Sequence, residues 1–390
     1  MSLTPVMDRW IRKTVQRHAP FNVHFDLTYR CNERCIHCYL DHEDYGEMTT
    51  AEVKDVFDQL AKAGTLFLTL SGGELFLRKD FFELLEYASS LQFDLSLKTN
   101  ALLVDAVRAR RLREAGVRRV QVSIYSAEPN VHDAITKVRG SWARSVAAVR
   151  LLKTENLLVK IACPLMKQNL GAHRSVRALA EQLGVPYVFD LTITPKIDGD
   201  TSTLALRNSA RDALSVLQDK TLGSIGFSRD GSVDPSSTGS VTSSGIESNA
   251  YDDIPCSAGH NSCYISPYGD VYPCVQMPVP TGNVRRQPFE EIWNGSPEMN
   301  RVRAIRDSQL PVCSRCSIRK YCERCPGLAK MEGGDLLGPY ERACELAEVK
   351  AQLAGMANPV SALHENNSSQ QKVPPPARLV ILQPAPAQRI

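Results

Sequence analysis

The sequence lacks the long apolar runs that would place it in a membrane. No stretch of its 390 residues approaches the roughly 20 consecutive apolar residues that a transmembrane helix needs. Residues 1–20 contain no apolar signal-peptide core, so nothing in them argues for export. We therefore expect a cytoplasmic protein without a membrane partner.

A strong excess of one charge is also missing. Lys and Arg number 46 against 43 Asp and Glu, which leaves a formal net charge of +3. A dedicated nucleic-acid binder carries a marked basic excess, so the charge balance excludes that class. With 43% hydrophobic and 23% charged residues, the chain has the composition of an ordinary globular protein. Its length suits two domains, or one domain with a large appendage.

Twelve cysteines are unexpected in a chain that should be cytoplasmic. In a reducing compartment, clustered cysteines indicate metal ligands or redox groups rather than disulfides. Only Cys163 stands alone, and it suits a small buried hydrophobic residue. The other eleven form two blocks with short spacings, which random core cysteines would not do. The blocks are Cys31, Cys35 and Cys38, and then Cys256, Cys263, Cys274, Cys313, Cys316, Cys322, Cys325 and Cys344.

Strand and helix patterns alternate from residue 21 to residue 200. Such alternation predicts βαβ units and a parallel sheet, that is, an α/β fold. Six units are too few for a closed eight-stranded barrel, so we expect a partial, six-stranded β/α barrel. The predicted strands are 22–28, 66–71, 93–99, 119–125, 158–163 and 187–194. The predicted helices between them include 49–64, 78–92 and 140–155.

Strand parity predicts a barrel with a polar lumen. In segment 22–28, Val23, Phe25 and Leu27 share one face and polar residues share the other, because successive side chains alternate across a strand. The apolar faces should meet the helices, and the polar faces should line a lumen that can hold a ligand. The candidate lumen residues are His24, Asp26, Gln121, Tyr125, Lys160 and Asp190.

The remaining chain divides by composition. We expect a helix over 204–220, a flexible Ser/Gly-rich loop over 228–249, and a disordered Pro-rich end. The predicted parts are an N-terminal lead (1–20), the partial barrel (21–200), a helix and linker (201–255), a Cys-rich domain (256–358) and a disordered tail (359–390).

The first cysteine block has the spacing Cys-x3-Cys-x2-Cys directly after the first strand, at the end where β/α barrels place their chemistry. Three thiolates satisfy three irons of a four-iron cluster and leave one iron open. Zinc also accepts three cysteines, with His37 or His42 as a fourth ligand. After the second strand come Gly72, Gly73 and Glu74. The glycines allow a close backbone approach to a ligand, and the carboxylate can accept from an ammonium.

These motifs together resemble the radical S-adenosylmethionine (SAM) superfamily, in which an aromatic residue, here Tyr39, follows the three cysteines. The resemblance covers residues 21–200. It implies that the three thiolates hold a [4Fe-4S] cluster whose open iron binds the amino and carboxylate groups of SAM. The Gly-Gly-Glu segment then contacts the SAM ammonium. Asn100 and Ser123 would line the SAM site, and Arg139 would hold the SAM carboxylate.

The second cysteine block resembles the SPASM extension, which holds auxiliary iron–sulfur clusters in radical SAM enzymes. This block has a two-residue step between Cys322 and Cys325 where the family usually has three. From spacing alone, zinc ribbons are the competing interpretation. The resemblance implies two fully ligated [4Fe-4S] clusters, one on Cys256, Cys263, Cys274 and Cys325 and the other on Cys313, Cys316, Cys322 and Cys344.

The resemblance also implies a reaction. A flavodoxin or ferredoxin supplies a low-potential electron, SAM is cleaved to methionine and a 5′-deoxyadenosyl radical, and this radical abstracts hydrogen from a peptide. The cofactors carry the hard chemistry, and the protein positions the substrate. We expect an oxidoreductase that matures a ribosomally made peptide by a crosslink, a thioether or epimerisation, similar to the pyrroloquinoline-quinone peptide cyclase group.

Two alternatives remain open at this point. One is an anaerobic sulfatase-maturing enzyme that generates formylglycine, and the other is a zinc-binding scaffold without enzymatic activity. No leader-binding domain fits into residues 1–20, so we expect a separate protein that recognises the leader peptide.

The catalytic candidates are Asp198, Tyr125 and Cys163. Asp198 follows the sixth predicted strand and could reach a substrate, while Tyr125 belongs to the polar face of the fourth. Cys163 could donate a hydrogen atom, as an epimerase requires. Strand parity argues against that role, because Cys163 shares the helix-facing side with Val159 and Ile161.

Overall fold

The computed structural model describes residues 5–219 and 253–367. Its centre is a nine-stranded sheet with the strand order β6-β5-β4-β3-β2-β1-β7-β8-β9. The strands are β1 (Asn22–Thr28), β2 (Phe67–Gly72), β3 (Asp94–Thr99), β4 (Val117–Ser123), β5 (Leu158–Pro164), β6 (Tyr187–Asp190), β7 (Ser262–Ile265), β8 (Asp270–Tyr272) and β9 (Gly282–Asn283).

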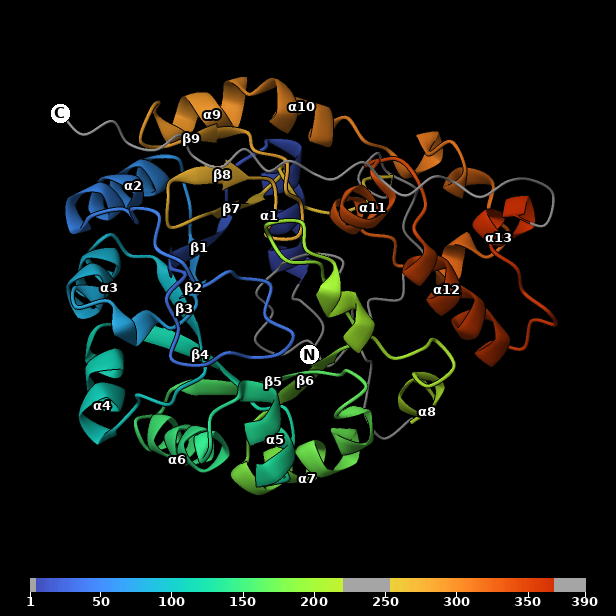
Figure 1. Cartoon of the computed structure of the whole chain (residues 1–390). Coiled ribbons are helices and arrows are strands. Elements are labelled where there is room, and N and C mark those ends of the chain that lie inside the picture. Colours follow the sequence, from blue (N-terminus) through green and yellow to red (C-terminus); the bar gives the residue numbers. More distant parts are fainter. Residues whose placement is uncertain (1–4, 220–252, 368–390) are drawn as a thin grey trace.

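The first six strands are parallel to their neighbours, and helices connect them. Figure 1 shows α2 to α7 on the outer, convex side of the curved sheet. This arrangement confirms the predicted α/β partial barrel. The helices of this part are α1 (Pro5–Gln16), α2 (Thr50–Lys62), α3 (Phe81–Ser90), α4 (Ala106–Glu114), α5 (Pro129–Thr136), α6 (Ser141–Thr154), α7 (His173–Leu183) and α8 (Leu214–Leu217).

The hydrophobic core lies between the sheet and these helices, as strand parity predicts. Val23, Phe25 and Leu27 are fully buried in it. Full burial of a Val, Leu or Phe side chain stabilises a fold by roughly 1.5–3 kcal/mol. A capping box starts α2, since the hydroxyl of Thr49 accepts from the backbone N–H of Glu52 while the Glu52 carboxylate accepts from that of Thr49. Because the outer face of the strands packs against the helices, the polar face of the strands is directed toward the lumen.

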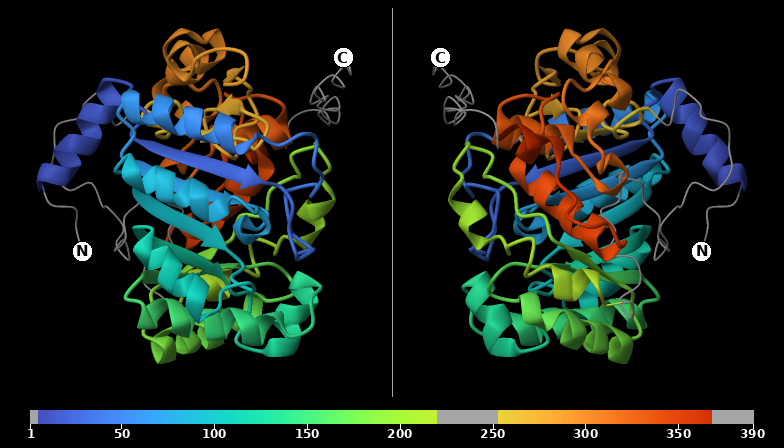
Figure 2. Two further views of the ribbon diagram at one scale, coloured as in Figure 1. Left: turned by 90° about the vertical axis from the view of Figure 1, so that its left-hand side faces the viewer. Right: turned by 90° about the vertical axis from the view of Figure 1, so that its right-hand side faces the viewer.

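The Cys-rich part extends the sheet, which strand patterns alone did not predict. β7 pairs in parallel with β1, and β8 and β9 follow in antiparallel pairing. Figures 1 and 2 show α11 and α12 beside the open side of the barrel, across the sheet from α3. The helices of this part are α9 (Phe289–Gly295), α10 (Pro297–Arg303), α11 (Pro326–Gly333), α12 (Glu341–Leu353) and α13 (Ala362–Asn367).

Two segments depart from the predicted secondary structure. β6 ends at Asp190 rather than at residue 194, because the Asp190 carboxylate accepts from the N–H of Thr192 at 2.7 Å and the chain turns there. Within the predicted helix 204–220, the described residues 204–219 are mostly not helical. Here the Arg207 guanidinium donates to the carbonyl of Ile193 at 2.7 Å. It also forms a bidentate ion pair with Glu332 of α11. Tertiary contacts therefore override the local helical pattern.

The two ends of the described chain are more ordered than predicted. The N-terminal lead contains α1, and its Thr14 hydroxyl accepts from the side-chain amide of Asn261 at 3.0 Å. The predicted disordered tail is wrong for residues 362–367, which form α13. The predicted loop 228–249 and the tail beyond residue 367 lie outside the described residues. Within residues 5–219 and 253–367, none of the helices has the length and apolarity needed to cross a membrane.

Candidate functional site

The first three cysteines lie in the loop after β1, and α5 holds this loop in place. The N–H groups of Arg34 and Ile36 donate to the carbonyls of Thr136 and Ile135 at 3.1 and 3.0 Å. All twelve cysteines are free thiols. The loop with Cys31, Cys35 and Cys38, called the trio loop below, is therefore a fixed platform of unpaired thiols at the carboxyl end of the barrel strands.

The two glycines after β2 pack against the start of the trio loop. The N–H of Gly73 donates to Thr28 O and that of Glu74 to Arg30 O, both at 2.8 Å. A Cβ on Gly73 would lie 2.3 Å from Arg30 O, and a Cβ on Gly72 would lie 2.1 Å from Thr28 O. The expected close approach thus exists, but it is made to the backbone of the neighbouring loop rather than to a ligand.

Glu74 links this segment to the end of β3. Its fully buried carboxylate accepts from the Thr99 hydroxyl at 2.9 and 2.8 Å and from the N–H of Asn100 at 3.1 Å. Burial raises the pKa of Glu74 to about 7, against the effect of these hydrogen bonds. The side-chain amide of Asn100 lies 3.8 Å from the Cys31 sulfur. Glu74, Asn100 and the trio therefore converge, and their contact with SAM stays a prediction.

Tyr125 lies against the trio loop. Its hydroxyl is 3.8 Å from the Cys35 sulfur, and its ring packs edge-on against His37 with 4.8 Å between centroids. Burial raises its pKa, and so do the neighbouring charges of Cys35 and Glu33. A buried neutral hydroxyl at this distance can hydrogen-bond to cluster sulfur more readily than it can act as a base.

Tyr39 and Ser123 both lie beside this platform. The carbonyl of Tyr39 accepts from the N–H of Ile197 at 2.9 Å, which ties the end of the trio loop to the segment after β6. Ser123 is the last residue of β4, on the same face as Tyr125.

Three predicted site residues lie away from this platform. Arg139 is exposed in the loop between α5 and α6. Asp198 is exposed in a turn, where its carboxylate accepts from the N–H of Asp200 at 2.9 Å. Cys163 is buried in the core between sheet and helices, near the amide of Asn169. The roles of Arg139 and Asp198 stay predictions, whereas the position of Cys163 opposes a hydrogen-donor role because its thiol does not face the lumen.

A buried polar group in the lumen joins the two parts of the chain. The Tyr264 hydroxyl of β7 donates to the fully buried carboxylate of Asp26 at 2.9 Å. The ring of His24 lies 3.1 Å from the other oxygen of Asp26. Sequence analysis found His24 and Asp26 by parity but missed Tyr264, because the pairing of β7 with β1 leaves no local signal.

The lumen also contains a lysine on β3 that was not singled out from the sequence. Lys98 pairs in register with Gln121, which pairs with Lys160, so these three residues form one row across the lumen face. Burial lowers the pKa of Lys98, and the carboxylates of Asp26 and Asp190 act in the opposite direction. The lumen therefore presents both cationic and anionic groups to a ligand.

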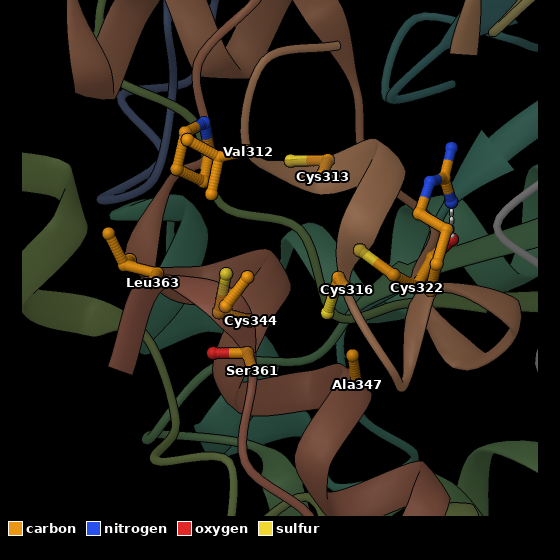
Figure 3. Close-up of a pocket in the computed structure, with 11 residues that line it drawn as sticks. Val312, Cys313, Cys316, Cys322, Cys344, Ala347, Ser361 and Leu363 are labelled. Carbon is orange, nitrogen blue, oxygen red and sulfur yellow. Dashed lines mark hydrogen bonds between the residues drawn. The ribbon is translucent and has the colours of Figure 1, made fainter. Parts of the chain in front are cut away.

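Four cysteines of the second block surround one small hollow (Figure 3). Arg319 also borders it. Burial raises the pKa of Cys344 to about 12, and so do the charges of neighbouring cysteines. The four are Cys313, Cys316, Cys322 and Cys344, the set that the SPASM resemblance implies.

Three of the other four cysteines, Cys256, Cys274 and Cys325, form a separate group near β7 and β8. Burial raises the pKa of Cys256 to about 12, and the charges of Cys325 and Cys274 raise it further. Cys325 therefore lies with Cys256 and Cys274, as the resemblance implies despite the shortened step. Cys263 lies on β7 in register with Val23 of β1 and is buried in the same hydrophobic core, so its place in this group stays a prediction.

These thiols fit iron–sulfur clusters. Burial alone makes a thiolate unfavourable, and bound iron offsets that cost because the metal ligand is the deprotonated thiolate. The trio and the two later groups bring unpaired thiols together, and thiolates are the ligands of such clusters. Three ligands in the trio would leave one iron of a [4Fe-4S] cluster open, and the two four-cysteine sets that the resemblance implies stay a prediction.

A serine from the predicted tail borders the hollow that Cys313, Cys316, Cys322 and Cys344 surround. Ser361 is 2% exposed and borders the hollow, where its hydroxyl lowers the pKa of Cys344 against the effect of burial. Its N–H donates to Glu348 of α12 at 2.7 Å, and so holds the segment in place.

We expect Ser361→Ala to lower the reduction potential of the cluster in this hollow, because hydrogen bonds to cluster sulfur set its potential. Ser361→Thr, which keeps the hydroxyl, should preserve it. Potentiometric titration followed by electron paramagnetic resonance measures the shift. Ser314→Ala is the matched control, since that hydroxyl donates to Leu310 O at 2.6 Å instead. An unchanged potential in Ser361→Ala would show that the hydroxyl does not reach the sulfur.

Comparison with known families agrees with this division of the cysteines. Residues 25–179 match the profile of the radical SAM superfamily. Residues 256–317 match the SPASM iron–sulfur cluster-binding domain. The first match contains the trio loop, and the second contains the first five cysteines of the second block.

Curated relatives and solved structures extend the comparison. The chain is 29% identical to an AdoMet-dependent heme synthase of Methanosarcina barkeri over 82% of this chain and 95% of the relative. It is 26% identical to the mycofactocin maturase MftC of Mycobacterium ulcerans over 78% of this chain and 82% of the relative. Its fold is similar to that of Streptococcus suis SuiB bound to the precursor peptide SuiA, with a TM-score of 0.64, 16% identity and coverage of 88% and 82% of the two chains.

Proposed function

We propose that this chain modifies a ribosomally made peptide. Its radical SAM domain and its SPASM domain make it a radical SAM enzyme. The observation that carries this proposal is the polar lumen between the trio loop and the Cys274 group. Lys98 faces that lumen from β3, and the charges of both Asp26 and Cys274 act on it. A substrate held there would lie between the two kinds of cluster site.

The chain's own residues position the reaction. When bound at the trio, the [4Fe-4S] cluster supplies reductive cleavage of SAM for hydrogen abstraction. Asn100 and Glu74 border the trio and would orient SAM, while the Gly72–Gly73 contact fixes the loop that holds the iron.

The names of relatives support a peptide substrate. The mycofactocin maturase and the subtilosin biosynthesis protein AlbA of Bacillus subtilis, 25% identical over 78% of this chain, are named for natural products that they help to make. We further propose that a separate protein presents the leader peptide and that a flavodoxin or ferredoxin donates the electron. Formylglycine formation in a sulfatase stays the alternative among peptide substrates.

One observation favours a second candidate. The first relative is a heme synthase that this chain covers almost fully. Lys98 would suit a carboxylate of a heme precursor as well as an acidic peptide side chain, because an ammonium forms charge-assisted hydrogen bonds with either. The second candidate is therefore a heme precursor as substrate.

The test is an anaerobic comparison of substrates. Co-expression with any small precursor peptide found encoded beside the gene should yield a product that has lost two hydrogen atoms, or that takes up deuterium from solvent on epimerisation. Mass spectrometry of the peptide decides this. Incubation with iron-containing porphyrin carboxylates, SAM and dithionite is the second arm, in which loss of carbon dioxide would favour the heme precursor. Absence of 5′-deoxyadenosine in both arms would overturn the proposed function.

A further inference from the structure

We propose that the barrel rim formed by the trio loop, α5 and the β5–α7 connection docks an acidic one-electron carrier protein. This inference rests on the proposed function, since a SAM-cleaving site must be supplied with electrons. It adds the surface through which they arrive, and the chemistry of the partner that fits that surface.

A hollow marks this surface. Ile36, Val131, Ile135 and Leu206 line its apolar part. Ile36 belongs to the trio loop, between Cys35 and Cys38, and its N–H donates to Ile135 O at 3.0 Å. One wall of the hollow is therefore the same loop that presents the three thiols. A protein seated here would approach the trio without entering the lumen.

Lys137 lines this hollow, and three further cations lie on the same edge of the barrel. Arg34, Lys137, Arg144 and Lys167 are exposed, and we call them the basic rim. They follow the carboxyl ends of β1, β4 and β5, which parallel strands bring to one edge of a sheet. Among the ion pairs formed within residues 5–219 and 253–367, none includes a basic-rim residue. Their charge is thus available to a partner.

The charge of the edge is not uniform. Asp41, Glu43 and Asp198 all raise the pKa of Tyr45, so these acidic groups gather beyond the end of the trio loop. An acidic protein would be attracted toward the basic rim and repelled from the Tyr45 region. Such complementary potentials fix orientation and speed association. The pattern favours an acidic partner in one orientation over the hollow.

The proposed step is a single electron transfer. The reduced carrier loses one electron, and the cluster held by the trio gains it; no atom or proton changes place. Flavodoxins and ferredoxins are acidic proteins that carry single low-potential electrons on a flavin or an iron–sulfur centre. They share the chemistry that the basic rim would recognise, and separate measurements with each distinguish them.

The test reverses two rim charges in the full, anaerobically reconstituted protein. For Lys137→Glu/Lys167→Glu, we expect the Kd of a purified flavodoxin, and separately of a purified ferredoxin, to rise about tenfold at low salt. Formation of 5′-deoxyadenosine with subsaturating carrier should fall by a similar factor, whereas formation driven by dithionite should not change. High salt should weaken binding of the unmodified protein, because ions screen exposed charges.

Two matched variants complete the test. Lys62→Glu/Arg118→Glu reverses two exposed charges at the opposite end of the barrel, and it should leave carrier binding unchanged. Arg315→Glu/Lys320→Glu reverses two exposed charges on either side of Cys316 in the sequence. If binding follows Arg315 and Lys320, or if the rim variant binds normally, the docking proposal is wrong. If dithionite yields no SAM cleavage in the unmodified protein, the proposed function fails instead, and the measured Kd values still decide the docking.

Discussion

Replacing Cys31, Cys35 and Cys38 with alanine is expected to abolish formation of 5′-deoxyadenosine from SAM. The three thiols lie on one loop that hydrogen bonds tie to α5, and they leave one iron of a four-iron cluster open for SAM. Without them the chain should lose about four of roughly twelve irons and keep its auxiliary clusters. Iron analysis and chromatography of the SAM reaction measure both effects.

The control for this variant is Cys163→Ala. Because Cys163 lies in the core away from all three groups, its removal should leave the iron content unchanged. A triple alanine variant that still cleaved SAM would refute the assignment of the trio. A triple variant that lost all its iron would instead show that the three sites do not assemble independently.

Gly73→Ala should strongly destabilise the trio loop. The added Cβ would lie 2.3 Å from Arg30 O and 2.6 Å from Tyr29 O. Backbone atoms cannot rotate away as a flexible side chain can, so the trio loop must move. We expect a loss of about 3 kcal/mol in the free energy of unfolding, at the upper end for overpacking. The SAM-induced change in the spectrum of the trio's cluster should also be lost.

Gly171→Ala provides the comparison for this effect. Its added Cβ would meet no heavy atom within 4 Å, so the change should stay within about 0.5 kcal/mol. Denaturant unfolding under anaerobic conditions measures both variants. Gly73→Ala with the stability and spectrum of the unmodified protein would mean that the loop can relax away from β2.

Much of the barrel could be predicted because its information is local. Alternation of Val23, Phe25 and Leu27 with polar residues marks β1 at its observed bounds, and Thr49 with Glu52 marks the start of α2. Cysteine spacing likewise separated the trio from the later block. These signals depend on neighbours within a few residues, which a single sequence displays.

The features that were missed depend on partners far along the chain. The glycines after β2 signal a close approach, but the sequence does not show that the approaching atoms belong to Thr28 and Arg30. Tyr264 contacts Asp26 only because β7 pairs with β1. Ser361 lay in a stretch that composition marked as disordered, yet Glu348 of α12 fixes its backbone. Long-range pairing decides each of these positions.

The same limit applies to the predicted roles of single residues. Arg139 and Asp198 follow strands at the correct end of the barrel, but the structure leaves both exposed to solvent. Position after a strand predicts the edge on which a side chain lies, and it does not predict the direction in which the loop turns. Cys163 is the opposite case, because strand parity alone placed it correctly on the helix side.

Because β7 pairs in parallel with β1, each part of the chain supplies the partner strand for the sheet edge of the other. A barrel cut off after residue 200 would expose the unpaired N–H and C=O groups of β1 at a sheet edge, and such an edge invites pairing between molecules and aggregation. The auxiliary part thus covers an edge that the barrel alone would leave open. Its loss would cost solubility before it cost electron transfer.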